Sequence, residues 1–224
     1  MVHSVDFQQR LNLAAKQLTI SLTPKQSELL LEYLNQIQRW NRSYNLTALK
    51  NPEQMLIQHV FDSMAVEPTF RNILDKNTVN NPLIVDVGSG AGLPGVVLAI
   101  LHPEWRVHCI DAVEKKTAFI RHMIGVLGLP NLEVSHTRVE TIEPLQADIV
   151  VSRAFASLLD FVSLAGRHIA SGGQLLAMKG RHPDEEINIL HAETPWQVNA
   201  IYPLTVPELD AQRCLLSLNC QGNP

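Results

Sequence analysis

The chain has 224 residues, 46% of them hydrophobic and 18% charged, which is typical of a soluble globular protein with one α/β domain and a smaller appended part. A formal net charge of −4 argues against a general nucleic-acid coat protein, so any polyanionic partner has to be met by a local basic patch. The start shows no secretory signal, no apolar run approaches the ~20 residues of a membrane span, and the three cysteines form no C-x-x-C pair, so we expect a cytoplasmic protein without a disulfide framework.

Residues 1–78 are predicted to form a helical extension. Thr23-Pro24 places a capping hydroxyl before a proline at the first helical position, and apolar residues then recur at helical spacing from Leu29 to Trp40. Asn51-Pro52 is a second start signal, and the apolar stripe from Met55 to Met64 follows it. Both patterns predict amphipathic helices with one buried face.

A change of pattern then divides the chain in two. The polar stretch 71–82 ends in Asn80-Asn81-Pro82 and is predicted to be a connector. After it, residues 83–87 form a short, continuous apolar run, as expected for a parallel strand buried on both faces. We therefore predict a helical extension over 1–78 and a second domain over 79–224.

Strands and helices alternate in this second domain. Such alternation implies right-handed βαβ units in a doubly wound, Rossmann-like α/β sheet. The predicted strands are 83–87, 107–111, 132–135, 148–152, 174–179, 198–202 and 214–218, and helices are predicted over 93–101 and 114–128.

Three alternate glycines, Gly88, Gly90 and Gly92, join the first strand to the first helix. This turn sits at the carboxyl edge of the sheet, where ligands bind in open α/β folds, and glycine lets the backbone approach a ligand closely. A dinucleotide motif, G-x-G-x-x-G, read from Gly88 would need a glycine at position 93, which is Leu93. The spacing is instead Asp86-x-Gly-x-Gly-x-Gly, the motif of class I S-adenosylmethionine-dependent methyltransferases. A tight turn without a ligand is the alternative.

Two carboxylates flank this turn in the predicted sheet. Asp86 can serve the ammonium group of such a ligand, directly or through water. Asp111 ends the second strand about twenty residues later, where a carboxylate can accept both ribose hydroxyls of either ligand. Capping of the following helix is the alternative role for Asp111.

The end of the fourth predicted strand limits the acceptor. Ser152-Arg153-Ala154-Phe155 is neither the N/D-P-P-Y/F signature that holds exocyclic amines nor a cysteine nucleophile for C5 carbons. A ring nitrogen with an in-plane lone pair, such as guanine N7, needs no proton removed before attack. The absence of an obvious base in the sequence suits such a target.

With these residues assembled, the chain closely resembles the ribosomal RNA small subunit methyltransferase G family, also called glucose-inhibited division protein B. The motifs that carry the resemblance are Arg39–Thr47, His59–Ser63, Asp86–Gly95 and Ser152–Ala156. The first and last of these are specific to the family, whereas the glycine turn alone indicates only the superfamily.

The resemblance implies a class I methyltransferase sheet, mostly parallel, with seven strands and an antiparallel last strand. It further implies methyl transfer from S-adenosylmethionine to N7 of a guanine in 16S ribosomal RNA near the decoding site. The partner would be small-subunit RNA or the 30S particle, and we expect a monomer that uses no metal. The alternatives are a nicotinamide-dependent oxidoreductase and a non-catalytic RNA-binding assembly factor on the same fold.

The motifs shared with this family imply roles for individual residues of the site. Gly88 and Leu93 would line the methionine and ribose side of the donor, Val139 and Glu140 would flank its adenine, and Arg153 would be the catalytic residue. The full set of expected donor-binding residues is Asp86, Gly88, Ser89, Gly90, Gly92, Leu93, Asp111, Val139, Glu140 and Arg153.

Arg153 and the other basic residues each have an expected functional role and an alternative structural one. We expect Arg153 to touch donor or RNA, the alternative being an ion pair with Asp148 or another carboxylate. His59 is expected to pack against Trp40 or Tyr44, since no metal-ligand spacing surrounds it. The residues expected to form a phosphate-contacting rim, or alternatively a solvated charged face, are Arg39, Arg42, Lys50, Lys115, Lys116, Arg121, Lys179 and Arg181.

Overall fold

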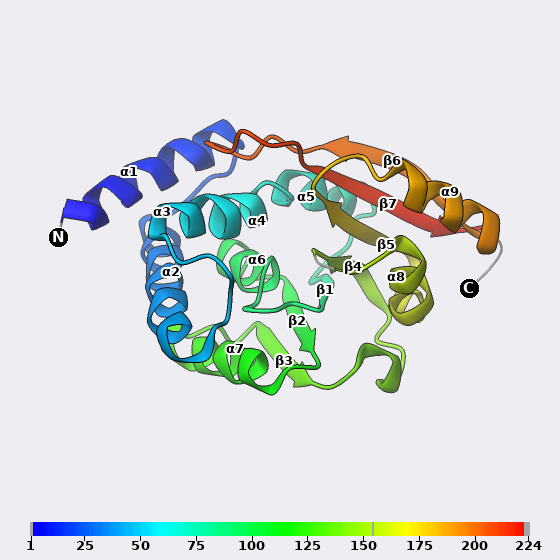
Figure 1. The fold of residues 1–224 in the computed structure, drawn as a ribbon, viewed down its shortest axis with the longest axis horizontal. Helices are drawn as coiled ribbons and strands as arrows, with labels where there is room; N and C mark the ends of the chain where they lie inside the picture. The colour runs from blue at the N-terminus through cyan, green and yellow to red at the C-terminus, as the bar shows by residue number, and fades with distance from the viewer. Residues whose placement is uncertain (1, 154, 222–224) are drawn as a thin grey trace.

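A seven-stranded sheet with helices on both faces forms the centre of the computed structural model, which describes residues 2–153 and 155–221 (Figure 1). The helices are α1 (Val2–Gln17), α2 (Pro24–Tyr44), α3 (Pro52–Met55), the π-helical turn η1 (Leu56–Phe61), α4 (Asp62–Met64), α5 (Glu67–Lys76), α6 (Gly95–Leu101), α7 (Glu114–Leu127), the 3₁₀ turn η2 (Val139–Thr141), α8 (Leu158–Ala165), the 3₁₀ turn η3 (Gly166–His168) and α9 (Asp184–Glu193). The strands are β1 (Leu83–Val87), β2 (Arg106–Asp111), β3 (Leu132–His136), β4 (Ala147–Ser152), β5 (Ile169–Lys179), β6 (Trp196–Pro203) and β7 (Cys214–Cys220).

The strand order is β3-β2-β1-β4-β5-β7-β6. Strands β1 to β5 are parallel, and β7 runs antiparallel to both of its neighbours, β5 and β6. This confirms the predicted mostly parallel sheet with an antiparallel last strand. The chain leaves β1 in one direction toward β2 and β3 and later returns on the other side as β4, so the carboxyl ends of β1 and β4 border the crevice where ligands bind in such sheets.

The start signals of the helical extension are confirmed in atomic detail. The Thr23 hydroxyl accepts from the Gln26 N–H at 3.2 Å, and the Gln26 side chain accepts from the Thr23 N–H at 2.9 Å, which completes a capping box. The Asn51 side chain accepts hydrogen bonds from the N–H groups of Glu53 and Gln54.

The predicted connector over 71–82 is wrong in its first half. Helix α5 continues to Lys76, because Phe70 and Leu74 repeat at helical spacing within a polar run and are both buried. The other boundaries differ less: β5 begins at Ile169 rather than at 174, and α6 begins at Gly95 rather than at 93.

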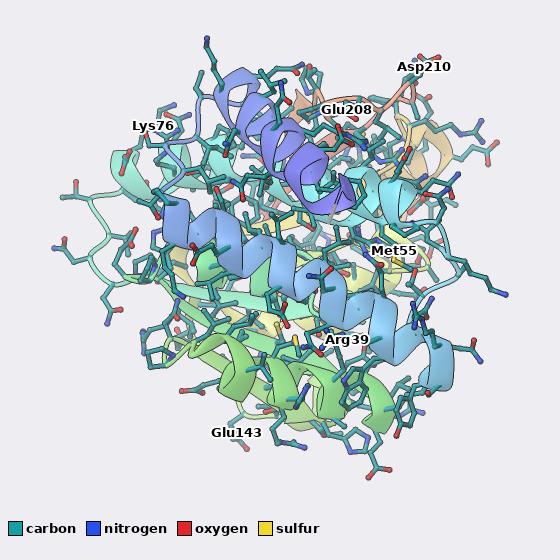
Figure 2. The ribbon with its side chains drawn as sticks, turned by 90° about the vertical axis from the view of Figure 1, so that its left-hand side faces the viewer. Arg39, Met55, Lys76, Glu143, Glu208 and Asp210 are labelled. Atoms are coloured by element: carbon teal, nitrogen blue, oxygen red, sulfur yellow. The ribbon has the colours of Figure 1, made fainter. Side chains whose placement is uncertain are left out.

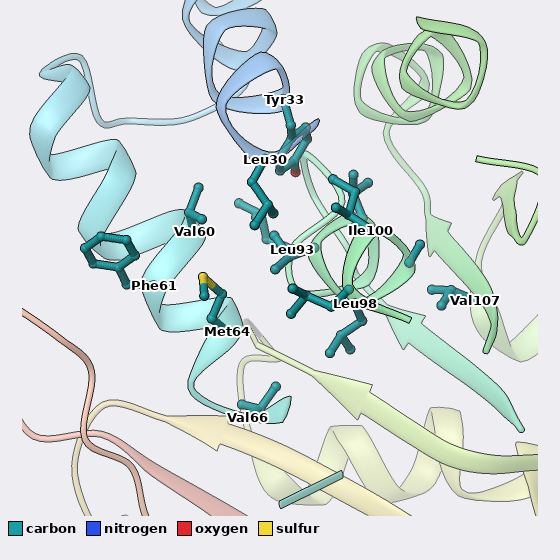
Figure 3. Packing of buried hydrophobic residues seen from close by; sticks show 14 of the residues in the cluster. Leu30, Tyr33, Val60, Phe61, Met64, Val66, Leu93, Leu98, Ile100 and Val107 are labelled. Carbon is teal, nitrogen blue, oxygen red and sulfur yellow. The ribbon is translucent and has the colours of Figure 1, made fainter. Parts of the chain in front are cut away.

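Two hydrophobic clusters lie on opposite faces of the sheet. Helices α1 to α7 cover one face, and Figure 3 shows Leu30, Tyr33 and Met64 of the extension packed with Leu93 and Leu98 at α6. Helices α8 and α9 cover the other face, as Figure 1 shows. The extension therefore shares one core with the sheet, while the boundary at residue 78 remains a prediction.

None of the helices formed by residues 2–153 and 155–221 is long and apolar enough to cross a membrane. Over the same ranges, no three His, Cys, Asp or Glu side chains are grouped so that they could hold a metal ion.

His102 and Glu67 form a pH-sensitive pair between α5 and the end of α6. Glu67 is 2% exposed, and its Oε1 lies 2.8 Å from His102 Nε2. Burial alone lowers the pKa of His102, but hydrogen bonds to Glu67 and Glu104 outweigh this effect and the pKa is raised. Because the folded pKa lies above the unfolded one, the pair stabilises the fold at low pH and loses this contribution as the pH rises through the folded value.

We therefore expect His102→Gln to lower the melting temperature more at pH 5.5 than at pH 8.5. The difference should be roughly 1 kcal/mol, or about 2–4 °C for a chain of this size. Thermal unfolding of both proteins at the two pH values measures it. An equal loss at both would contradict a stabilising charge on His102.

Candidate functional site

The glycine turn after β1 presents open backbone at the carboxyl edge of the sheet. Gly88 has φ +67° and Gly92 has φ +93°, both in the left-handed region that favours glycine. A Cβ atom added at Gly88 would meet nothing within 4 Å, whereas one added at Gly92 would collide with the Val96 side chain. Gly88 therefore leaves space for a ligand, and Gly92 allows α6 to pack closely.

The turn is anchored from both sides. The N–H groups of Gly88 and Ser89 donate to the Ile110 carbonyl at 2.8 and 3.1 Å, which ties the turn to β2. The Tyr33 hydroxyl of α2 donates to the Ala91 carbonyl at 2.7 Å. Sequence reasoning placed Tyr33 only on an apolar stripe and missed this bond, although a buried phenol is expected to find a polar partner. The helical extension therefore supports the ligand turn directly.

Asp86 lies beneath the turn rather than in the open space above it. Its side chain is fully buried, and Oδ2 accepts from the Gly95 N–H at 2.8 Å. A Cβ at Gly95 would collide with Cys109 Sγ, so glycine is needed for this close approach. Oδ1 has no hydrogen-bond partner among the described residues. Of the two expected routes to a ligand ammonium group, this burial favours the one through water.

Burial raises the pKa of Asp86 to about 7, against the lowering effects of the Gly95 hydrogen bond and the Arg153 charge. The folded pKa lies above the ordinary aspartate pKa of 3.8, so ionisation destabilises the fold progressively as the pH rises from about 4 to about 7. We expect Asp86→Asn, which keeps an acceptor for Gly95, to melt at a higher temperature than the unsubstituted protein at pH 8, with a smaller difference at pH 4.5. Calorimetry at both pH values checks this, and a difference independent of pH would contradict it.

Asp111 bridges the turn and the start of α7. Its Oδ2 accepts from the Gly90 N–H and its Oδ1 from the Val113 N–H, both at 2.8 Å. Lys116 Nζ lies 3.9 Å from Oδ2. The N-cap of α7 is Val113, and Asp111 bonds the N–H of this residue rather than one inside the helix, so the alternative role of a helix cap is wrong. Each oxygen retains a second lone pair that a ribose hydroxyl could use.

Of three further residues expected to bind the donor, Leu93 and Val139 have buried side chains and Glu140 is half-buried. Leu93 is 3% exposed and packs in the first cluster (Figure 3), so its side chain belongs to the core. Val139 is also buried, in the second cluster, while Glu140 is half-buried with its carboxylate 3.8 Å from Arg138. Both lie in η2, which follows β3.

Arg153, directly after β4, reaches across to the helical extension. Its Nη1 donates to the Gln58 carbonyl at 2.9 Å and to Asp62 Oδ2 at 3.3 Å. The ion pair with Asp148 offered as one alternative is wrong, because the Asp148 carboxylate accepts from the Leu83 N–H instead. The other alternative, a different carboxylate, is present as Asp62. Ala154, the next residue of the motif, lies outside the described residues.

The Gln58 carbonyl that binds Arg153 belongs to the π-helical turn η1. In a π-turn each N–H bonds one residue further back than in an α-helix, and such turns are frequent at functional sites. Asp62 follows this turn at once and is also bound by Arg213, whose Nε donates to Asp62 Oδ1 at 2.9 Å. Sequence reasoning missed Asp62 and Arg213, because their contact spans 151 positions.

A cavity of about 340 Å³ opens where Arg153 and Asp62 meet. It lies at the carboxyl ends of β4 and β5, next to the start of β7. Its polar lining comes from Gln58, His59, Asp62, Arg153, Lys179 and Arg213. Apolar walls are supplied by Leu49, Met178 and Leu204, so the cavity combines flat apolar surface with charged groups.

Some of the expected basic rim is already paired. Lys179 is 14% exposed and bonds both oxygens of Glu186, at 3.0 and 2.7 Å, so it is not a free phosphate contact. His59 was expected to pack against Trp40 or Tyr44, but its Nε2 lies 2.9 Å from the Thr47 hydroxyl.

The remaining rim forms an exposed face on α2 and α7, which lie side by side in Figure 2. Trp40 of α2 packs against Phe119 and His122 of α7, with ring centroids 5.4 Å apart in both pairs. The exposed cations around these rings are Arg39 and Arg42 on α2 and Lys115 and Arg121 on α7.

Leu93 excludes the dinucleotide motif G-x-G-x-x-G only when the motif is read from Gly88. Read from Gly90 instead of Gly88, the residues Gly90-Ala91-Gly92-Leu93-Pro94-Gly95 have the spacing G-x-G-x-x-G. Gly95 even fills the expected role of the third glycine, close packing of helix on strand. Spacing alone therefore does not separate the two ligand classes.

Comparison with known proteins does separate them. The model of a family described as rRNA small subunit methyltransferase G matches residues 26–216. A relative of that name from Bordetella pertussis is 55% identical over 96% of this chain and 94% of its own length, and one from Methylibium petroleiphilum is 44% identical over 96% and 95%.

Solved structures agree on the fold. A structure described as a SAM-dependent methyltransferase from Aquifex aeolicus is similar with a TM-score of 0.57 and 17% identity, covering 78% of this chain and 96% of that one. A ribosomal protein L11 methylase from Lactobacillus delbrueckii subsp. bulgaricus has a TM-score of 0.53 and 15% identity, with 78% and 81% covered. Together with the family match, these findings show that the chain belongs to the rRNA small subunit methyltransferase G family.

Proposed function

We propose that the chain transfers a methyl group from S-adenosylmethionine to N7 of one guanine in 16S ribosomal RNA, near the decoding site. The observation that carries this proposal is an open glycine turn beside a charged cavity at the sheet's carboxyl edge, in a chain of this family. The turn would hold the donor, and the cavity would take the base at the ends of the neighbouring strands β4 and β5. The proposed setting is cytoplasmic, with the chain acting as a monomer on RNA or on the 30S particle.

The residues of the turn fit the donor. The missing side chain at Gly88 leaves room for the ligand against the backbone, and the second lone pairs of Asp111 suit ribose hydroxyls. The half-buried Glu140 and its neighbour Val139 would flank the adenine. The bound donor supplies an already activated methyl group, so this chain has mainly to position the acceptor and exclude water.

N7 of guanine suits a site without a general base. The imidazole in the cavity, that of His59, is a weak base, because burial and the nearby Arg153 charge lower its pKa to about 4. Attack by the N7 lone pair releases no proton, so no residue has to accept one. Arg153 would lie between S-adenosylmethionine and the target guanine, in contact with one of them.

Phosphate contacts are assigned to the exposed face of α2 and α7. Arg39 and Arg42 of α2 and Lys115 and Arg121 of α7 are exposed on the two helices that the Trp40 contacts join, and Arg181, exposed shortly after β5, is a separate proposed contact. Cations interleaved with aromatic rings are typical of RNA-binding surfaces. This local patch would meet the polyanion despite the net charge of −4.

Incubation with tritiated S-adenosylmethionine and small subunits from cells that lack this protein tests the proposal. We expect label in 7-methylguanosine after digestion of the 16S RNA. Label in another nucleoside would contradict the N7 assignment. Absence of label, with the RNA still bound, would favour a non-catalytic assembly factor.

A further inference from the structure

One buried carboxylate in the cavity is held by two arginines from distant parts of the chain. Asp62 is 3% exposed. Its Oδ2 accepts a hydrogen bond from Arg153 and its Oδ1 accepts one from Arg213. Both guanidiniums have a quarter of their side-chain surface exposed. The cluster thus joins the helical extension, the end of β4 and the start of β7 at one wall of the cavity.

The cluster retains unused hydrogen-bonding capacity. Each Asp62 oxygen accepts one bond from the arginines and can accept another, since a carboxylate offers about four lone-pair sites. Arg213 uses Nε on Asp62 and Nη1 on the Gln212 carbonyl, and its Nη2 makes no hydrogen bond to the described residues. The wall therefore offers acceptors and a donor side by side.

The position of the wall relative to the glycine turn is set by the sheet. Strands β1 and β4 are neighbours, with Asp86 opposite Val151, so the turn and Arg153 end at the same edge. Arg153 is close enough for its charge to act on Asp86. Arg153 lines the cavity, whereas no residue of the glycine turn does, so a ring in the cavity would meet a donor held in the turn across Arg153.

We infer that Asp62 and Arg213 read the Watson–Crick edge of the target guanine in this cavity. Asp62 accepts from N1–H and the N2 amino group, and Arg213 donates to the neighbouring O6. This inference rests on the proposed function. Adenine presents an N1 lone pair to the carboxylate instead of a donor, so the same wall rejects it.

This orientation leaves N7, on the adjoining Hoogsteen edge, uncovered by Asp62 and free to attack. The N7 lone pair forms the bond to the methyl carbon while the sulfur–methyl bond breaks and its electron pair returns to sulfur. No proton moves, and the positive charge passes from the sulfonium to the guanine. The base has to leave its stack to enter the cavity, and the hydrogen bonds to Asp62 and Arg213 offset part of the free-energy cost of unstacking.

Inosine, which lacks the N2 amino group, tests the contact with Asp62. Small-subunit RNA carrying either guanosine or inosine at the position methylated by the unsubstituted protein is assembled into subunits, and kcat/KM is measured for both. Loss of one charge-assisted hydrogen bond predicts at least a roughly tenfold preference for guanosine. Equal rates on the two RNAs would overturn the inference without any variant.

The Asp62→Asn variant then assigns the preference to this carboxylate. We expect kcat/KM on guanosine to fall roughly tenfold or more, the preference over inosine to approach unity, and S-adenosylhomocysteine affinity measured by calorimetry to stay within about twofold. The two changes, Asp62→Asn in the protein and inosine in the RNA, form a double-mutant cycle. Non-additivity of their effects on kcat/KM measures the contact between Asp62 and the N2 amino group separately from general damage to the fold. An unchanged preference would refute the role of Asp62.

Glu67→Gln is the matched control. Glu67 is another buried carboxylate with two basic partners, Arg71 and His102, but it lies outside the cavity. Its substitution should lower the melting temperature and leave the preference for guanosine intact; loss of the preference in this variant as well would overturn the inference. Failure of the unsubstituted protein to make any 7-methylguanosine would instead refute the proposed function itself.

Discussion

A Gly88→Leu variant is expected to lose binding of S-adenosylhomocysteine by more than roughly 100-fold, or about 2.8 kcal/mol, while it keeps its fold. The reason is steric, because the new side chain enters the open space in which the backbone of the turn would approach the ligand. The left-handed backbone adds a strain of about 1–2 kcal/mol, which a chain of this size can tolerate. Calorimetric titration and thermal unfolding measure the two effects separately.

Gly128→Leu is the control for that strain. Gly128 has φ +63°, is exposed, and also has nothing within 4 Å of an added Cβ, but it caps the C-terminus of α7. Both variants should lose similar stability, and only Gly88→Leu should lose the ligand. Wild-type affinity in Gly88→Leu would place the donor elsewhere on the molecule.

Removal of the Arg153 guanidinium is expected to lower kcat/KM by roughly 100-fold, the size associated with misplacing a reacting group. Arg153→Met keeps the apolar stem and removes the bonds to the Gln58 carbonyl and Asp62, while Asp62 keeps Arg213. The effect should fall mainly on turnover, with a smaller loss of S-adenosylhomocysteine affinity.

Arg10→Met provides the comparison for this variant. Arg10 also forms a tertiary ion pair, 2.6 Å from Glu208, which is labelled in Figure 2, but this pair links α1 to the segment after β6. Arg10 does not line the cavity. Its kcat/KM should stay within about twofold of the unsubstituted protein. A normal rate in Arg153→Met would reduce Arg153 to a structural tie between β4 and the extension.

The order of the elements is well encoded in local sequence patterns. The cap at Thr23, the apolar run after Leu83 and the glycine at position 128 each signal an element through the residues beside it. The end of helix α5 is predicted as a connector because most of its residues are polar and its apolar stripe around Phe70 is short. Only the tertiary contact of this stripe with the core shows that the segment is helical.

The site is encoded less locally. The glycine turn is visible in the sequence, but whether a given glycine faces a ligand or a packed helix depends on what surrounds it, as Gly88 and Gly92 illustrate. Asp62 and Arg213 cannot be paired from spacing, because only the packing of the helical extension against the sheet brings them together. The spacing near Gly95 also fits a dinucleotide motif, so family membership, not the pattern, decided the ligand class.

Mapping of 7-methylguanosine in 16S RNA from cells with and without this protein tests the central claim most directly. Chemical cleavage at 7-methylguanosine, read out along the whole RNA, should reveal one position near the decoding site that is modified only when the protein is present. Restoring the gene should restore the modification, and restoring the Gly88→Leu form should not. An identical 7-methylguanosine pattern with and without the protein would contradict the account.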